Sequence, residues 1–420
     1  MTQATLSLII LLATAILMVV DIIPTSVVAI IGALACGFTG LIDKSELLAT
    51  LGTETMITLI GLSIVGSAMF KTGLANRMAR SILKVSGKNE NGVYIASMVI
   101  GTLLSAVASN TAVVITMIPL IMSMCQKVKV SPSRILYPMV AACSFGSALT
   151  LIGTPSNIAG NSVLAKFGLP GMGFFDVAWV GVPLTVVGFI YMMTLGKKTL
   201  PKDEYVEDET AIQDLDAIEP WNKKAVLTAV ICAVTLVVMV IQPSFLPLST
   251  TALCGAVILI VTRCISEKDA YHSIDFSTML LFTGLMTITT AVNASGGGNM
   301  LAQGIMKLIG NNTNPYFLTA MLGIVCLVLT SFISNTAAVM IMGTVAVYVA
   351  QAIGANPFTM VMVVVISANA CFATPIGGIA YTIVMKPGHY KFKDFFKMGW
   401  PLALINLILA IIIIPLVWSF

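Results

Sequence analysis

Two copies of the tripeptide Ser-Asn-Thr interrupt strongly apolar sequence, at Ser109-Asn110-Thr111 and at Ser334-Asn335-Thr336. Each copy has a hydroxyl residue four positions upstream and a Thr-Pro pair further downstream: Ser105 and Thr154-Pro155 for the first, Thr330 and Thr374-Pro375 for the second. Side-chain oxygens of Ser, Thr and Asn suit Na⁺, and free backbone N–H groups suit an anion. The pattern therefore predicts one kind of ion-binding site, made twice.

The spacing around each tripeptide indicates how such a site is built. Residues four apart lie on one face of a helix, so Ser105 and Ser109 stack two oxygens, and Thr330 and Ser334 do the same. The Asn amide that follows can turn its oxygen to a cation and its NH₂ group to an anion. Each tripeptide is therefore expected to serve both kinds of ion.

The Thr-Pro pairs predict helix breaks beside the same site. A small residue precedes each pair, Gly153 or Ala373, and lets backbone carbonyls close the cavity. Pro155 and Pro375 each remove a helix donor. One such motif alone is compatible with hydroxyls bonding back to the preceding turn and with a simple proline kink. Four motifs in two matched pairs favour a binding site.

The composition indicates an all-α polytopic membrane protein. The chain is 58% hydrophobic and 10% charged, too apolar for a soluble domain of 420 residues. The net charge of +4 implies no nucleic-acid partner, because the basic residues fall in loops. The eight cysteines contain no CxxC pair and predict neither a metal site nor a disulfide.

The chain reads as two copies of one unit. Pro24, Gly61 and Lys84 recur as Pro247, Gly284 and Lys307, each 223 residues later. The offset is 225 at the two tripeptides and 220 at the two Thr-Pro pairs. We therefore expect a first repeat over 1–195, a charged linker over 196–222 and a second repeat over 223–420.

Within each repeat, one apolar run is broken at the tripeptide and another at the Thr-Pro pair. We expect re-entrant hairpins over 92–126 and 315–352, and broken helices over 135–165 and 358–386. With the hairpins excluded, each repeat crosses the membrane five times. An odd number of crossings forces the two repeats to be inverted relative to each other.

The distribution of basic residues supports this topology. One face receives 19 of the 22 Lys and Arg, and the other receives only Lys44, Lys166 and Lys307. Because basic loops stay on the cytoplasmic side, both termini are expected outside and the linker in the cytoplasm of a cell whose plasma or inner membrane holds the protein.

The broken segments contain no charged side chain. No Asp, Glu, Lys, Arg or His lies between Glu90 and Lys127, between Arg134 and Lys166, or between Lys307 and Lys386. A proton-coupled pump needs a titratable group at depth, and an anion pore needs a ring of basic residues. Half-helix ends must therefore supply the electrostatics, which predicts a neutral site for Na⁺ together with an anion.

These motifs resemble the divalent anion/sodium symporter family of the ion transporter superfamily over essentially the whole chain. The resemblance rests on the two Ser-Asn-Thr tips, the two Thr-Pro breaks and the closing stretch from Thr374 to Gly399. It implies Na⁺-coupled import of a di- or tricarboxylate such as succinate, malate or fumarate. It also implies a homodimer in which a transport subdomain moves against a scaffold like an elevator.

The resemblance further implies three sets of contacts. One Na⁺ would be bound by Ser105, Ser109, Asn110 and Gly153, and a second by Thr330, the carbonyl of Ile333, Asn335 and Ala373. The anion would be bound by Ser109, Asn110, Thr111, Thr154, Pro155, Ser334, Asn335, Thr336, Thr374 and Pro375. Two sodium ions would cancel the charge of a dianion, so a stoichiometry of at least two is expected.

Other functions stay open at this point. Ala112-Val113-Val114 and Ala337-Ala338-Val339 leave fewer hydroxyls after each tripeptide than C4-dicarboxylate carriers of the family often have. Sulfate import, dicarboxylate exchange or efflux on the same fold are the alternatives. An intramembrane enzyme is disfavoured, because the broken segments contain no HExxH motif, no paired Asp and no Ser with a His or Lys partner.

Overall fold

The computed structural model describes all residues except 1, 21, 86–88, 202–221, 244, 309–312 and 376. Most of the predicted linker over 196–222 therefore lies outside the described residues. Among those described, the regular elements are helical, and eight helices are long and apolar enough to cross a membrane. This confirms the expected all-helical membrane protein.

The first repeat contains the hairpin and the broken helix as separate half-helices. Its elements are α1 (Gln3–Val20), α2 (Thr25–Phe38), α3 (Lys44–Leu51), α4 (Glu54–Lys71), α5 (Leu74–Val85), α6 (Glu90–Ser105), α7 (Asn110–Val128), η1 (Pro132–Arg134), α8 (Leu136–Ser147), α9 (Pro155–Lys166), α10 (Ala178–Tyr191), η2 (Met192–Gly196) and α11 (Lys197–Thr199). The hairpin consists of α6 and α7, and the broken helix of α8 and α9.

The second repeat follows the same order. Its elements are α12 (Lys223–Ile241), α13 (Leu248–Val261), α14 (Glu267–His272), α15 (Phe276–Ala294), α16 (Gly297–Leu308), α17 (Pro315–Thr330), α18 (Asn335–Ile353), α19 (Pro357–Ala368), η4 (Cys371–Ala373), α20 (Ile379–Met385) and α21 (Phe392–Val417). The hairpin is formed by α17 and α18, and the broken helix by α19 and α20. The short helices α3 and α14 lie in segments for which the sequence pattern predicts no element.

Two close helix crossings join the repeats and are related by the repeat offset. Gly61 of α4 packs against the backbone of Ala252 in α13, and Gly284 of α15 packs against the backbone of Ala29 in α2. A Cβ added at Gly61 would lie 2.5 Å from the carbonyl carbon of Ala252. Small residues let helices approach this closely in a membrane, where packing rather than water exclusion holds them together.

The two helices α2 and α13 are shorter than a full crossing. Each has 14 residues, which gives a length of about 21 Å, compared with a hydrocarbon layer of roughly 30 Å. Their crossings with α15 and α4 bury small residues such as Ala29 and Ala252 completely. Packing against the longer helices α15 and α4 therefore holds α2 and α13 in position.

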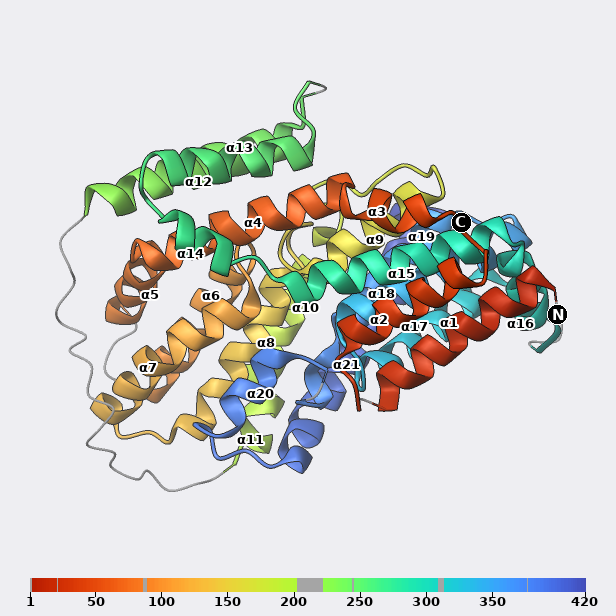
Figure 1. Ribbon diagram of the computed structural model, residues 1–420. Coiled ribbons are helices and arrows are strands. Elements are labelled where there is room, and N and C mark those ends of the chain that lie inside the picture. The colour runs from red at the N-terminus through yellow and green to blue at the C-terminus, as the bar shows by residue number, and fades with distance from the viewer. Residues whose placement is uncertain are drawn as a thin grey trace.

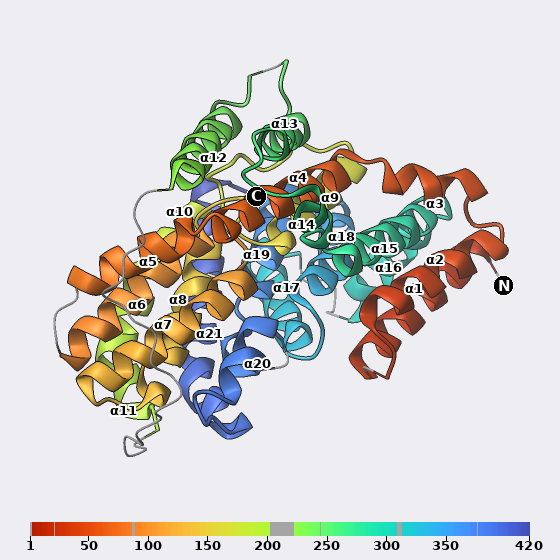
Figure 2. The ribbon, with the colours of Figure 1, turned by 60° about the vertical axis from the view of Figure 1, so that its left-hand side comes forward.

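The ribbon view shows where the chain termini and the basic helices lie. Figure 1 places both ends of the chain on its right-hand side, whereas α5 and α11, which carry basic residues, lie toward the left. Figure 2 shows α12 and α13 standing beside α4 at the edge of the helical body. Ion pairs on the basic side include Lys71–Asp269 at 2.6 Å and Arg134–Glu90 at 2.9 Å.

Candidate functional site

A central pocket of about 200 Å³ brings the two tripeptides together. Ser109-Asn110-Thr111 and Ser334-Asn335-Thr336 line it, although 225 residues separate them. The pocket is also lined by Gly153, Thr154 and Pro155 from the first break, and among the described residues no other one predicted from the sequence lines it. The remaining lining comes from Ser144, Ser147, Asp275, Thr278, Asn369, Cys371, Gly377, Gly378, Ile379, Ala380 and Tyr381.

Helices begin at this pocket. The first residues of α7, α9 and α18 are Asn110, Pro155 and Asn335, and all three line it. The first residue of the short α20, Ile379, lines it too. A helix N-terminus carries free N–H groups and about half a positive charge. These helix starts therefore contribute positive partial charge to the pocket.

Among the described residues, one charged side chain lines the pocket. Asp275 is the charged residue among those that line it, and no Lys, Arg or His contributes to this described lining. Its carboxylate caps α15, accepting a bond from Thr278 N at 3.0 Å and another from the Thr278 hydroxyl. Asp275 is exposed, so it stands at the mouth of the pocket.

In the first half of the site, two buried oxygens have no hydrogen-bond partner within the described residues. They are Ser105 Oγ and Asn110 Oδ1. The thiol of Cys143, a weak hydrogen-bonding group, lies near Ser105. Ser109 makes no capping bond to the start of α7. Buried oxygens without donors are costly unless a ligand supplies the missing contact, and Na⁺ is a ligand of that kind.

Gly153 closes the first half from the side of the break. A Cβ at this position would lie 2.5 Å from Ser147 O, so any larger residue would displace the chain. The Thr150 hydroxyl donates to Ala106 O, just after Ser105, and fastens the break to the hairpin. Of the predicted set, Ser109, Asn110 and Gly153 line the pocket, whereas Ser105, like its counterpart Thr330, does not appear in the described lining.

In the second half, the corresponding oxygens are engaged within the protein. The Thr330 hydroxyl contacts Ala368 O at 2.8 Å and Asn335 Oδ1 at 2.7 Å. Rotating the Asn335 amide by 180° lets its nitrogen donate to Ala368 O, Thr330 Oγ1 and Gly377 O at 3.2, 2.7 and 2.9 Å. Three oxygens, Ala368 O, Thr330 Oγ1 and Gly377 O, therefore surround the end of the Asn335 side chain, and a cation that displaced the amide nitrogen would meet all three.

The second break is wider than the first. α9 starts at Pro155 itself, whereas α20 starts at Ile379, four residues after Pro375. The Thr374 hydroxyl donates to Ser331 O at 3.1 Å and so ties the break to its hairpin. Thr374, Pro375, Ile333 and Ala373 do not appear in the described lining of the pocket. Ala368 O and Gly377 O are the carbonyls found beside Asn335.

Some lining residues are not among the sequence predictions. Thr278 is visible in the sequence only as the repeat partner of Thr55, and Asp275 has no such signal. Asn369, 8% exposed, is a polar residue at the end of an apolar run and could have been singled out on that basis. Tyr381 contacts Ser144 through a hydroxyl–hydroxyl bond of 3.0 Å, and both line the pocket.

The residues present fit Na⁺ better than a transition metal. Hydroxyl, amide and carbonyl oxygens surround both halves of the site, and unwound carbonyls of this kind coordinate Na⁺ in transporters. Across the described ranges, no group of three or more His, Cys, Asp or Glu could hold a metal ion. The donor set is therefore neutral and made of oxygen.

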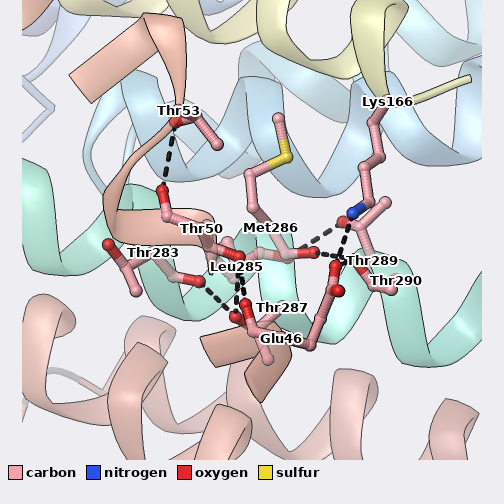
Figure 3. A network of polar contacts seen from close by, with 10 residues as sticks. All are labelled: Glu46, Thr50, Thr53, Lys166, Thr283, Leu285, Met286, Thr287, Thr289 and Thr290. Carbon is pink, nitrogen blue, oxygen red and sulfur yellow. Dashed lines mark hydrogen bonds and ion pairs between the residues drawn. The ribbon is translucent and has the colours of Figure 1, made fainter. Parts of the chain in front are cut away.

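A second cavity, of about 320 Å³, lies beside the start of α4. It is lined by Thr55, the repeat counterpart of Thr278, which bonds to Ser162 of α9 at 2.6 Å. Figure 3 shows the adjoining polar network, in which Lys166 of α9 reaches Glu46 of α3 at 2.8 Å. The hydroxyl of Thr290 in α15 donates to the same carboxylate at 3.1 Å.

Known proteins with similar sequences and structures are transporters. The chain is 21% identical to an uncharacterized transporter of Escherichia coli, YfbS, over 94% of this chain and 95% of that protein. Its fold is similar to the YdaH transporter of Alcanivorax borkumensis, with a TM-score of 0.67 and 16% identity over 99% and 97% of the two chains. Neisseria gonorrhoeae MtrF, described with a class of antimetabolite efflux pumps, gives a TM-score of 0.65 at 15% identity over 100% and 95%.

These similarities confirm the expectation of a transporter rather than an enzyme. The profile of the citrate transporter family (CitMHS) matches residues 12–364, which include both tripeptides and the first Thr-Pro pair. The matched range covers most of both repeats. This chain therefore belongs to the citrate transporter family.

Proposed function

We propose that the protein is a secondary active transporter that imports a divalent organic anion, a di- or tricarboxylate, together with Na⁺. This function corresponds to that of the divalent anion/sodium symporters. The observation that carries it is the pocket at which α7, α9 and α18 begin without any basic side chain in the described lining.

The anion half of the proposal rests on these helix ends. Three half-helix N-termini, each with about half a positive charge, attract a carboxylate without binding it irreversibly. The two tripeptides lie on different hairpins, so each can hold one end of a dianion. A pocket of about 200 Å³ is smaller than the roughly 300–1,000 Å³ typical of drug-sized ligands, which favours a small anion.

The sodium half of the proposal rests on the neutral oxygens. Asn110 Oδ1 and Ser105 Oγ would accept the first ion, with Ser109 and Gly153 beside them. Thr330 and Asn335 would bind the second with Ile333 and Ala373, and the carbonyls of Ala368 and Gly377 lie beside Asn335 as further oxygens.

The membrane potential explains why sodium is needed. Moving a dianion inward against 100 mV costs about 4.6 kcal/mol, and two Na⁺ cancel that term. The described pocket contains no Lys or Arg that could replace sodium as a counter-charge.

The two repeats differ in a way that supports alternating access by an elevator motion. Thr278, at the start of α15, lines the central pocket, but its counterpart Thr55, at the start of α4, is bonded to Ser162 in the second cavity. An inverted pair of repeats in one conformation gives these positions different surroundings. In the opposite conformation, Thr55 would face the substrate site and the Glu46–Lys166 pair would open.

The proposal is tested by transport into liposomes. Purified protein is reconstituted, and uptake of radiolabelled succinate, citrate or sulfate is measured under an inward Na⁺ gradient and under a matched K⁺ gradient. We expect carboxylate uptake that depends on Na⁺. Uptake that ignores Na⁺ but requires a dicarboxylate inside the liposomes would replace the proposal with an exchanger.

A second candidate function is transport of sulfate, or export, on the same fold. The short apolar stretches after each tripeptide favour an anion with fewer polar contacts than succinate. The structural neighbour MtrF is described among efflux pumps. Sulfate uptake that exceeds carboxylate uptake in the same liposomes would favour this candidate.

The assembly and orientation belong to the same proposal. We expect a homodimer, with both termini outside the cell and the 196–222 segment in the cytoplasm. Chemical crosslinking in membranes tests the dimer. Labelling of single cysteines placed next to Lys44 or Lys197 by an impermeant reagent tests the two faces, because these lysines lie on opposite sides in the proposed topology.

A further inference from the structure

A buried polar bridge connects the two halves of the site. Asn369 directly follows α19 of the second repeat and lines the central pocket. Its amide oxygen accepts a bond from the Ser156 hydroxyl, and its amide nitrogen donates to Asn157 Oδ1 at 2.7 Å. Ser156 and Asn157 are fully buried and belong to the first repeat. The bridge therefore links the two broken helices side chain to side chain.

The first-repeat end of the bridge reaches the carbonyls that surround the first proposed sodium site. Asn157 Nδ2 donates to Ser147 O at 3.0 Å and to Thr150 O at 2.9 Å. Thr150 in turn is fastened to the hairpin at Ala106, next to Ser105. Any shift of the Asn157 amide therefore moves the segment that closes the first site.

The second-repeat end reaches the other site through one peptide group. The carbonyl of Ala368, which contacts Thr330 Oγ1 at 2.8 Å, and the backbone N of Asn369 belong to the same planar unit. If a cation at Thr330 and Asn335 draws the Ala368 carbonyl toward itself, this peptide plane rotates. The rotation displaces the Asn369 side chain, which is held between Ser156 and Asn157.

The bridge is not a product of the repeat symmetry. At the offset of 220, the position of Asn369 corresponds to Leu149, and the positions of Ser156 and Asn157 correspond to Ile376 and Gly377. The Asn369 amide therefore has no counterpart in the first repeat, and the repeat symmetry does not explain it. Because a buried amide must be hydrogen-bonded to be tolerated, the two partners of Asn369, Ser156 and Asn157, restrict how either break can move.

We propose that Asn369 is a positioning residue that couples the two sodium sites, so that an ion at one site raises the affinity of the other. This inference rests on the proposed sodium coupling. Coupling between sites is commonly on the order of 5- to 150-fold in affinity. Without the Asn369 amide, the two sites should fill independently.

Equilibrium binding of ²²Na⁺ to the purified full chain, without anion, tests the coupling. The wild type should bind two ions with a Hill coefficient that approaches the number of sites, about two. Asn369→Ala should still bind two ions, but with a Hill coefficient of about one or less, because two uncoupled sites of unequal affinity bind without positive cooperativity. Ser156→Ala, which removes one bond of the bridge, should give an intermediate value and serves if Asn369→Ala does not fold.

The matched control is Asn406→Ala. Asn406 is also a buried amide, 1% exposed, and donates to Ile366 O of the same helix α19 at 2.8 Å, but within the described residues no hydrogen bond joins it to the bridge. It should keep the cooperativity of the wild type. Wild-type cooperativity in both Asn369→Ala and Ser156→Ala would overturn this inference but leave the proposed function standing. A wild type that binds no Na⁺ would overturn the proposed function and this inference with it.

Discussion

The two halves of the central pocket carry the same tripeptide, but they differ in whether the oxygens around it already have hydrogen-bond partners. In the first half, Ser105 Oγ and Asn110 Oδ1 are buried without a hydrogen-bond partner among the described residues. In the second half, Thr330 and Asn335 bond to each other and to Ala368 O, and the Ser334 hydroxyl caps α18 at Ala337 N. The two copies of the motif therefore differ in the free energy that an added ion would gain from them.

The difference teaches which half should bind sodium first. Oxygens that lack partners gain contacts from an ion at no cost to existing hydrogen bonds, whereas engaged oxygens must exchange them. A site that is already organised binds more tightly because less ordering is needed on binding. We therefore expect the first half to hold the tighter site and the second half to fill afterwards.

The largest expected effect comes from replacing the amide of either tripeptide. Asn110→Ala and Asn335→Ala each remove a proposed contact to Na⁺ and one to the anion. With about 1.5–3 kcal/mol for each charged contact, uptake should fall by roughly 100-fold or more, at 1.4 kcal/mol per tenfold. Uptake into liposomes measures this loss. Near-normal uptake by either variant would make its tripeptide structural.

The same two variants should separate the halves when sodium binding is measured. Asn335→Ala should keep one tight ²²Na⁺ site, because the first half is intact. Asn110→Ala should leave only weak binding. Equal residual affinity in the two variants would remove the distinction between the halves. A native dimer in crosslinking experiments serves as the control for folding.

A smaller effect is expected on stability without sodium. Thr330→Val removes the hydroxyl that bonds to Ala368 O and should lower the free energy of unfolding by about 1–3 kcal/mol. Ser105→Ala removes an oxygen that has no partner and should leave stability equal or slightly higher. Thermal unfolding in choline buffer compares the two. Sodium should then stabilise the wild type more than Ser105→Ala, and destabilisation by both substitutions alike would contradict the comparison.

The smallest expected effect concerns the helices that follow the two breaks. Lys166 at the end of α9 pairs with Glu46, whereas its counterpart Lys386, just after α20, forms no ion pair among the described residues. The hydrogen bond from Lys166 lowers the pKa of Glu46, so the pair is charged at neutral pH. Partly exposed pairs contribute about 0.2–1 kcal/mol.

Lys166→Met should therefore shift the balance of the two conformations by only a few fold, which corresponds to that energy. A cysteine at Thr55 reports the shift, because it should become more reactive toward a soluble thiol reagent when the pair is lost. Lys386→Met is the matched control and should leave this reactivity unchanged. Equal effects of the two substitutions would mean that the Glu46–Lys166 pair does not hold the observed conformation.

The sequence predicts the broken elements of this fold well because their signals are local. Ser109 and Ser334 stand immediately before new helices, and Pro155 is the first residue of α9. The Ser334 hydroxyl caps its helix, Pro155 lacks the N–H that a preceding turn would need, and Ser109 takes the N-cap position without a side-chain bond. The repeat offset then relates the two copies without any knowledge of their contacts.

The remaining features depend on how distant segments approach each other. Asp275 lines the pocket together with Ile379, more than 100 residues away in the sequence, and nothing within its own neighbourhood in the sequence indicates this. Gly377 O lies beside Asn335, although the second break runs on to Ile379 before a helix resumes. The length of an unwound segment depends on tertiary packing, and local helix propensity does not predict it.

The absence of fixed charge in the broken segments has an electrical consequence. No charged residue lies between Arg134 and Lys166 or between Lys307 and Lys386, so these segments themselves would move no ionised side chain through the field when the carrier returns empty. A dianion with two sodium ions is also neutral in transit. Each further sodium ion adds one elementary charge per cycle, worth about 2.3 kcal/mol per 100 mV. The current carried per anion would then count directly the sodium ions beyond two.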